Sequence, residues 1–158
     1  MYKLVQPFFI IVESPFHAGS GDSLGIVDMP IQRERHTEFP KIEGSSVKGC
    51  LRSWFSEDEN QKHIALIFGP DDGAKHAGAL GFTDARLLLF PVRSVKGIYA
   101  WITCPLVLKR FMKDIKLFDK NSIKIEIPDK NTIPDDGSDI LINEKDIILE
   151  EYSFQVKG

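Results

Sequence analysis

The segment from residue 17 to residue 43 most limits how this chain can fold, because no helical or alternating hydrophobic pattern persists across it. Prolines and glycines interrupt it throughout, at Pro30, Pro40, Gly19, Gly21 and Gly25. Loops of this length inside a compact domain are usually functional or disordered. Because this one is rich in charged and hydroxyl-bearing residues, we expect a long functional loop over residues 15–44.

A strand and a helix are predicted on either side of this loop. Residues 3–14 are rich in β-branched and aromatic side chains, and their continuous apolar run favours a central strand covered on both faces. After the loop, apolar residues recur at helical spacing and predict a helix with Ser45 or Ser46 as its N-cap. The apolar stripe consists of Val47, Cys50, Leu51, Trp54 and Phe55.

The rest of the chain indicates an α+β domain. We expect a short helix over about residues 59–68 that stops at Gly69, and a longer helix over residues 105–118. Residues 80–93 are expected to form two strands or one bent strand, and further strands are predicted within residues 97–105, 122–128 and 145–156, the first two regions pairing in one sheet. Trp54 and Trp101 fall within these patterns, which predicts core packing for both. The element order predicts an antiparallel sheet with helices on one face.

Composition limits the classes of function. A chain of 158 residues with 42% hydrophobic residues suits one globular domain. Its net charge of -3 argues against a protein that coats duplex DNA, and because the acidic excess lies in the last third, a nucleic-acid surface belongs upstream. Two cysteines without metal-site spacing indicate a reduced, cytoplasmic setting. The apolar run at residues 8–12 is too short for a signal peptide or a membrane span, so no membrane partner is expected.

The sequence EGSSVKG can form an anion site at a helix start. It places Gly44, the hydroxyls of Ser45 and Ser46 and unpaired backbone N–H groups at a helix N-terminus, with Lys48 one turn further on. The spacing is not that of a Walker loop. The alternative is an ordinary Ser-capped helix with a solvated lysine.

The RERH cluster offers a second set of cationic groups. Arg33, Arg35 and His36 lie on the loop with Glu34 among them, and arginines in such a setting can bind phosphates or stack on unpaired bases. The alternative is a surface ion-pair patch built with Glu34 and Glu38.

Acidic and histidine side chains of the loop are candidates for catalysis. Asp22 and Asp28 can serve as metal ligands or bases, and His17 and His36 as acid–base groups. An isolated aspartate, with a pKa near 3.9, is a weak proton acceptor at neutral pH. The alternative is that these aspartates only form turns.

Five segments, in this order, resemble one known family: PIQRERHT, FPKIEGSSVKG, IFGP, FPVRSVKGIYAWITCPLVLKRF and ILEE. The chain is similar to the RAMP superfamily and, within it, to the repeated backbone subunit of the type III-B (Cmr) CRISPR effector of antiviral defence. The resemblance implies a ferredoxin-like, RRM-like palm. It also implies a guide (CRISPR) RNA and a target single-stranded RNA as partners, cleavage of the target at regular intervals, and a helical filament with other copies of the chain and other Cmr subunits.

The resemblance also implies roles for individual residues. Asp28 matches the family's catalytic aspartate, and His17 matches a loop histidine near the same site. Lys48 matches a guide-RNA-binding lysine. The family's cleavage depends on a divalent metal ion, Mg or Mn, and Asp28 is the expected ligand. Guide contact is extended to Ser45, Ser46, Arg33, Arg35 and His36.

Two features depart from the family's pattern. Glu38 stands where relatives usually carry glycine, which adds a charge and reduces backbone freedom. Relatives are also much longer, so residues 1–158 are expected to be a truncated RAMP domain or half of a split or fused subunit. The alternatives to a cleaving subunit are an RNA-binding backbone subunit without catalytic activity and a guide-processing endoribonuclease.

Overall fold

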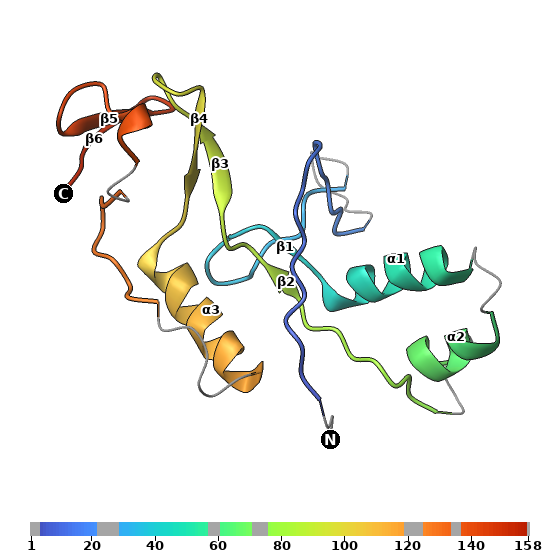
Figure 1. Cartoon of the computed structure of the whole chain (residues 1–158). Coiled ribbons are helices and arrows are strands. Elements are labelled where there is room, and N and C mark those ends of the chain that lie inside the picture. The colour runs from blue at the N-terminus through green and yellow to red at the C-terminus, as the bar shows by residue number, and fades with distance from the viewer. Residues whose placement is uncertain are drawn as a thin grey trace. The chain divides into compact units, whose positions relative to one another are not determined.

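The computed structural model describes residues 4–21, 29–56, 61–70, 76–118, 125–133 and 137–157 of the chain. These residues form helices and two-stranded antiparallel sheets, which confirms the α+β fold class (Figure 1). The chain divides into two compact units, residues 10–87 and residues 1–9 together with 88–158.

The unit of residues 10–87 contains β1 (Lys41–Ile42), α1 (Gly44–Ser56), α2 (Gln61–Phe68) and β2 (Ala85–Arg86). β1 pairs with β2, Lys41 lying opposite Arg86. α1 packs on α2, and the ring of Phe55 lies 5.7 Å from that of Phe68. Phe68 is only 2% exposed and also stacks on Phe82. A small aromatic core therefore holds the two helices together.

The end of α2 falls where the sequence predicts it. Gly69, directly after the helix, has a φ of 90°, a left-handed conformation that glycine adopts without strain. Its carbonyl accepts a hydrogen bond of 2.8 Å from Arg52 of α1. The backbone of Gly78 lies so close to this helix end that an added Cβ would come within 2.5 Å of the Phe68 carbonyl carbon. These contacts fix the chain that returns toward β2.

The other unit contains β3 (Phe90–Arg93), β4 (Tyr99–Ile102), α3 (Pro105–Phe118), the 3₁₀ turn η1 (Gly137–Ile140), β5 (Asp146–Leu149) and β6 (Tyr152–Gln155). β3 pairs with β4 and β5 with β6, each as an antiparallel hairpin. A bridge between Ser94 and Leu149 joins the two hairpins. The Glu150 carboxylate strengthens this junction by accepting hydrogen bonds from the backbone N–H and Nε of Arg93 at 2.9 and 3.0 Å.

The predicted central strand over residues 3–14 is wrong for the described residues 4–14, which form no strand. Their apolar side chains are exposed, Phe8 by 63% and Ile11 by 82%. An apolar run favours a strand only where neighbouring backbone supplies the ladder, and no described segment pairs with this one. Without that shared neighbour, the expected single sheet is three two-stranded sheets within the described residues.

Three other strand predictions need correction. Residues 80–93 form two strands, β2 and β3, which is one of the two expected forms, but β2 pairs with β1 rather than with the later strands. Of the predicted strand over residues 122–128, residues 122–124 lie outside the described residues, and residues 125–128 form no strand because no described segment gives them a ladder. Residues 145–156 form the β5–β6 hairpin instead of one strand, since the chain reverses at Glu150, whose φ is 53°.

The predicted core packing of both tryptophans is wrong. Trp54 is 66% and Trp101 54% exposed. On α1, Phe55 rather than Trp54 fills the position that contacts α2. On β4, the buried residue is Ala100, and successive side chains of a strand point to opposite faces, so Trp101 points away from the core. The three helices themselves are confirmed at Gly44–Ser56, Gln61–Phe68 and Pro105–Phe118.

Candidate nucleic-acid interface

The second half of the predicted loop is ordered by backbone hydrogen bonds. Residues 30–34 run between residues 18–20 on one side and residues 39–41 on the other, with bridges Gly19–Ile31 and Arg33–Pro40. The N–H of Gln32 donates to Ala18 at 2.8 Å, and its carbonyl accepts from Lys41 at 3.0 Å. This strand-like segment explains how a chain without hydrophobic periodicity holds a fixed shape.

Side chains alternate along this segment. Gln32 and Glu34 are buried, at 7% and 9% exposure, whereas Arg33 and Arg35 are exposed. Because successive side chains of an extended chain point to opposite sides, Arg33 lies on the outward side, and the exposed Arg35 opens the turn of residues 35–37 that follows. Arg35 makes no hydrogen bond or ion pair with another residue in the described part of the chain. Its guanidinium is therefore available to an external anion.

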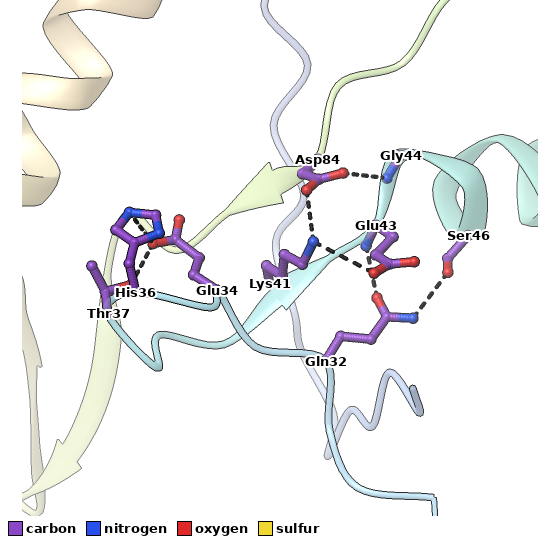
Figure 2. Close-up of polar contacts among 9 residues, drawn as sticks. All are labelled: Gln32, Glu34, His36, Thr37, Lys41, Glu43, Gly44, Ser46 and Asp84. Carbon is purple, nitrogen blue, oxygen red and sulfur yellow. Dashed lines mark hydrogen bonds and ion pairs between the residues drawn. The ribbon is translucent and has the colours of Figure 1, made fainter. Parts of the chain in front are cut away.

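The arginines do not form the surface ion-pair patch with Glu34 and Glu38 that was considered as an alternative. Arg33 donates 2.7 Å to the backbone carbonyl of Glu38 rather than to its carboxylate. Glu34 accepts a hydrogen bond from the Thr37 hydroxyl and lies 3.9 Å from Nε2 of the exposed His36 (Figure 2). The arginines therefore do not depend on Glu34 or the Glu38 carboxylate for their position.

Glu38 has a left-handed backbone, with a φ of 59°. This conformation costs an L-residue about 1–2 kcal/mol, whereas glycine adopts it without that cost. The glycine expected here from the family resemblance therefore has a physical reason. The carboxylate of Glu38 adds a negative charge at an exposed position of the loop.

Helix α1 begins at Gly44, so the predicted N-cap at Ser45 or Ser46 is wrong, and Glu43 precedes the first helical residue. The first N–H groups are satisfied by side chains from other segments. Glu43 N–H donates to Gln32 Oε1 at 2.7 Å, and Gly44 N–H donates to Asp84 Oδ1 at 3.0 Å (Figure 2). These acceptors remove the need for a serine cap, and leave Ser45 and Ser46 in the first turn.

Asp84 and Lys41 form an ion pair beside this helix start. Asp84 Oδ2 accepts a hydrogen bond of 2.8 Å from Lys41 Nζ, and Glu43 lies 3.5 Å from the same ammonium (Figure 2). The hydrogen bond from Lys41, followed by that from Gly44, holds the pKa of Asp84 below its usual value. The hydrogen bond to Asp84 raises the pKa of Lys41. A carboxylate therefore already occupies the Gly44 N–H group that the sequence offered to a phosphate.

The remaining predicted phosphate ligands stay accessible. Ser45 is exposed, and Ser46 and Lys48 are half-buried. Lys48 makes no hydrogen bond or ion pair with any residue that the structure describes. The first turn of α1 therefore offers two hydroxyls and one ammonium group to an anion.

The predicted catalytic residues are described only in part. Asp28 and Asp22 lie outside the described residues. His17 is exposed, and its Nε2 lies 2.7 Å from the carbonyl oxygen of Met29, the residue after Asp28. A carbonyl only accepts, so Nε2 carries the hydrogen and Nδ1 is the ring nitrogen left to exchange a proton. Within the described ranges, no three His, Cys, Asp or Glu side chains are grouped to bind a metal ion.

Sequence reasoning missed three residues of this site: Gln32, Lys41 and Asp84. Gln32 had a signal, because glutamine and glutamate alternate with arginine in QRER. Asp84 had no such signal, because it reaches the helix start from a segment 40 residues along the chain.

None of the helices in the described residues has the length and apolar character needed to cross a membrane.

Comparison with known proteins identifies the family. The model of the RAMP superfamily matches residues 9–155. The Pyrococcus furiosus protein named CRISPR system Cmr endoribonuclease Cmr4 is 45% identical over 148 residues, covering 91% of this chain and 50% of that protein. The Saccharolobus solfataricus CRISPR system CMR subunit Cmr4 is 29% identical over 161 residues, covering 98% and 51%. The chain spans about half the length of these curated relatives.

Solved structures agree with the sequence comparison. The crystal structure of oligomeric Cmr4 from Pyrococcus furiosus has a TM-score of 0.75 at 40% identity, covering 92% of this chain and 52% of that chain. A type III-B Cmr-beta complex bound to cognate target RNA contains a chain with a TM-score of 0.68 at 23% identity, covering 89% and 55%, which supports the fold alone. The family model and the Cmr4 similarity confirm the resemblance found in the sequence, and the chain belongs to the RAMP superfamily.

Proposed function

We propose that this chain is part of a backbone subunit of a type III-B CRISPR effector, which binds guide RNA and cuts complementary target RNA. The observation that carries the proposal is the 45% identity to a protein named Cmr endoribonuclease over 91% of this chain. The proposed partners are guide RNA, target single-stranded RNA, other copies of the chain and other Cmr subunits, and the proposed location is the cytoplasm.

The loop and helix surface suits the binding of RNA backbone. Arg33, on the extended segment, and Arg35, in the turn that follows it, are both exposed, and Lys48 adds a further cation. Arginine recognises phosphate through its planar fork, and lysine acts as a point charge. Because base pairing supplies the choice of sequence in a guided effector, the protein needs to bind only backbone and shape. This division of roles between base pairing and protein accounts for a site rich in groups that can donate hydrogen bonds to phosphate.

Cleavage is proposed to proceed by attack of a ribose 2′-hydroxyl oxygen on the adjacent phosphorus. The 2′-hydroxyl gives up its proton, the new P–O bond forms, and the bond to the 5′-oxygen breaks. The products are a 2′,3′-cyclic phosphate and a 5′-hydroxyl after that oxygen takes up a proton. In-line attack needs a nucleotide released from the stacked duplex. His17 Nδ1 suits proton exchange, since its Nε2 is held by Met29.

Asp28 is proposed as the ligand of a divalent metal ion, Mg or Mn. An aspartate of ordinary pKa accepts protons weakly at neutral pH, which favours this role over that of a base. Such an ion, when bound, would offset the negative charge that develops on the phosphate. The residues of this chain would bind and orient the RNA around that phosphate.

The deciding experiment is Asp28→Ala in a complex reconstituted with guide RNA and the other subunits. Loss of target cleavage with normal assembly is expected, and Asp129→Ala, at an exposed position of the other unit, is the matched control. Unchanged cleavage by Asp28→Ala contradicts the catalytic assignment and favours a backbone subunit that only binds RNA. Cleavage of CRISPR repeat RNA by the isolated chain would instead favour a guide-processing enzyme. Removal of divalent metal by a chelator, followed by addition of Mg or Mn, tests the metal requirement.

A further inference from the structure

The Gln32 side chain connects three segments of the proposed RNA-binding surface. Its Oε1 accepts the N–H of Glu43 at 2.7 Å. Its Nε2 donates to the carbonyl of Gly19 at 2.8 Å and lies 3.1 Å from the hydroxyl oxygen of Ser46 (Figure 2 draws the contacts with Glu43 and Ser46). Only 7% of Gln32 is exposed, and its three hydrogen bonds are part-buried. Gln32 therefore holds the loop, β1 and the start of α1 in one arrangement.

The partners of Gln32 fix the orientation of its amide group. The backbone N–H of Glu43 can only donate, so it must face the oxygen of the amide. The carbonyl of Gly19 can only accept, so it must face the nitrogen. The second hydrogen on Nε2 then points at Ser46 Oγ. Exchange of the amide oxygen and nitrogen would break both backbone hydrogen bonds, so only one orientation is compatible with the site.

This orientation determines what the Ser46 hydroxyl can do. A hydroxyl has one proton to donate and two lone pairs that accept. Nε2 of Gln32 takes one lone pair, so the proton of Ser46 remains to be donated. No described residue accepts it. The first turn of α1 thus presents a hydroxyl that is prepared to donate to an oxygen outside the chain.

We infer that Gln32 is a positioning residue, which holds the Ser46 hydroxyl as a hydrogen-bond donor to an RNA phosphate oxygen beside Lys48. This inference rests on the proposed RNA-binding function. The N–H of Gly44 already donates to Asp84 and is not available to a phosphate. Side-chain donors of the first turn therefore become more important for binding the phosphate. The backbone of Gln32 is hydrogen-bonded to Ala18 and Lys41, which fixes the position of Gln32 next to Arg33 in the same segment.

The test compares the affinity of the full 158-residue chain and its variants for a fluorescently labelled oligouridine. Ser46→Ala removes the donor. Gln32→Met removes the amide without adding charge. Gln32→Glu keeps an acceptor for the Glu43 N–H but draws the hydroxyl proton of Ser46 to its own carboxylate. Each variant is expected to weaken binding about tenfold, the size typical of a hydrogen bond to a charged group.

A double-mutant comparison separates positioning from a general structural effect. If Gln32 acts through Ser46, Gln32→Met combined with Ser46→Ala weakens binding by about the same tenfold as either change alone. Independent effects would multiply to about a hundredfold and overturn the inference. Gln155→Glu, the same change at an exposed site in the other unit, controls for added charge and should leave binding within about twofold.

Lys48→Ala distinguishes failure of this inference from failure of the proposed function. If Lys48→Ala weakens binding but Ser46→Ala does not, the role of Gln32 is contradicted while RNA binding at this surface stands. If neither change weakens binding, both proposals are contradicted. The Ser46 side chain bonds no backbone group among the described residues, so Ser46→Ala should not disturb folding. The test therefore stays decisive even if circular dichroism shows that Gln32→Met does not fold.

Discussion

Asp84 Oδ2 lies 2.8 Å from the ammonium nitrogen of Lys41, although the two residues are 43 positions apart in the sequence. Asp84 directly precedes β2, and Lys41 opens β1. The other oxygen of the same carboxylate accepts the N–H of Gly44 at the start of α1 (Figure 2). The Asp84 side chain therefore joins the β1–β2 pair to helix α1, which carries the groups proposed to bind phosphate. Its negative charge also offsets the positive charge of Lys41.

Asp84→Asn is expected to lower the free energy of unfolding at neutral pH by less than about 1 kcal/mol, because the Asp84 side chain is 46% exposed. The asparagine can still accept from Gly44, but it loses the ion pair. Since folding lowers the pKa of Asp84, the wild-type advantage exists above about pH 4 and disappears as the pH falls through the folded value. Urea unfolding of both proteins from about pH 2 to pH 7 measures this difference.

The stabilising contribution of the Lys41–Asp84 ion pair also has an upper pH limit. Folding raises the pKa of Lys41, so its contribution is present below about pH 10 and is lost as the pH rises through the folded value. Asp129→Asn, at an exposed position, serves as the control. A difference between wild type and Asp84→Asn that stays constant into strong acid would contradict the role of this ion pair.

Glu38→Gly is expected to stabilise the protein. It removes the strain of a non-glycine residue at a φ of 59° but keeps both backbone hydrogen bonds at this position, the N–H to Glu34 and the carbonyl from Arg33. After the entropy cost of glycine in the unfolded chain, a gain of about 0.5–1 kcal/mol in the free energy of unfolding should remain. Glu38→Ala, which keeps the Cβ atom, should show no gain. Equal stability of the two variants would rule out strain at this position.

Helices were predictable from the sequence because their signals are local. Apolar residues at helical spacing predicted all three helices, and the glycine after α2 marked its end. The start of α1 was misplaced because its N–H groups are satisfied by Gln32 and Asp84 rather than by the neighbouring serines. A cap supplied by another segment leaves no pattern near the helix that it caps.

The sequence could suggest residue types for the candidate site but not their arrangement. Charged and hydroxyl groups indicated Arg33, Arg35 and Lys48, and their accessibility in the structure agrees with a binding surface. The burial of Gln32 and Glu34 on either side of the exposed Arg33 was missed, because both buried residues are polar. Hydrophobic patterns cannot reveal a segment whose inward face is polar and held by hydrogen bonds. The central-strand prediction failed for a related reason, since pairing depends on partners that local sequence does not specify.

Ser94→Ala is expected to raise the free energy of unfolding by about 1 kcal/mol. Ser94 is 8% exposed at the junction of the two hairpins. Its hydroxyl has no hydrogen-bond partner in the described part of the chain. Burying an unpaired hydroxyl costs free energy that alanine avoids. Ser153→Ala, at an exposed position of β6, is the control and should change stability by less than about 0.5 kcal/mol. A marked loss of stability in Ser94→Ala would show that the hydroxyl is hydrogen-bonded in solution.

Arg35→Ala is expected to weaken binding of single-stranded RNA and to reduce its dependence on salt. Removing one arginine–phosphate ion pair should lower the slope of log affinity against log salt concentration by about 0.7. Arg33→Ala should give a similar change, and the double variant about twice that change, because both arginines are exposed on the same loop. Arg93→Ala is the matched control, since Arg93 is engaged by Glu150 in the other unit. Fluorescence anisotropy across a salt series measures these slopes. A slope for Arg35→Ala that equals the wild-type value, with the same slope for Arg93→Ala, would show that RNA phosphate does not contact this side of the loop.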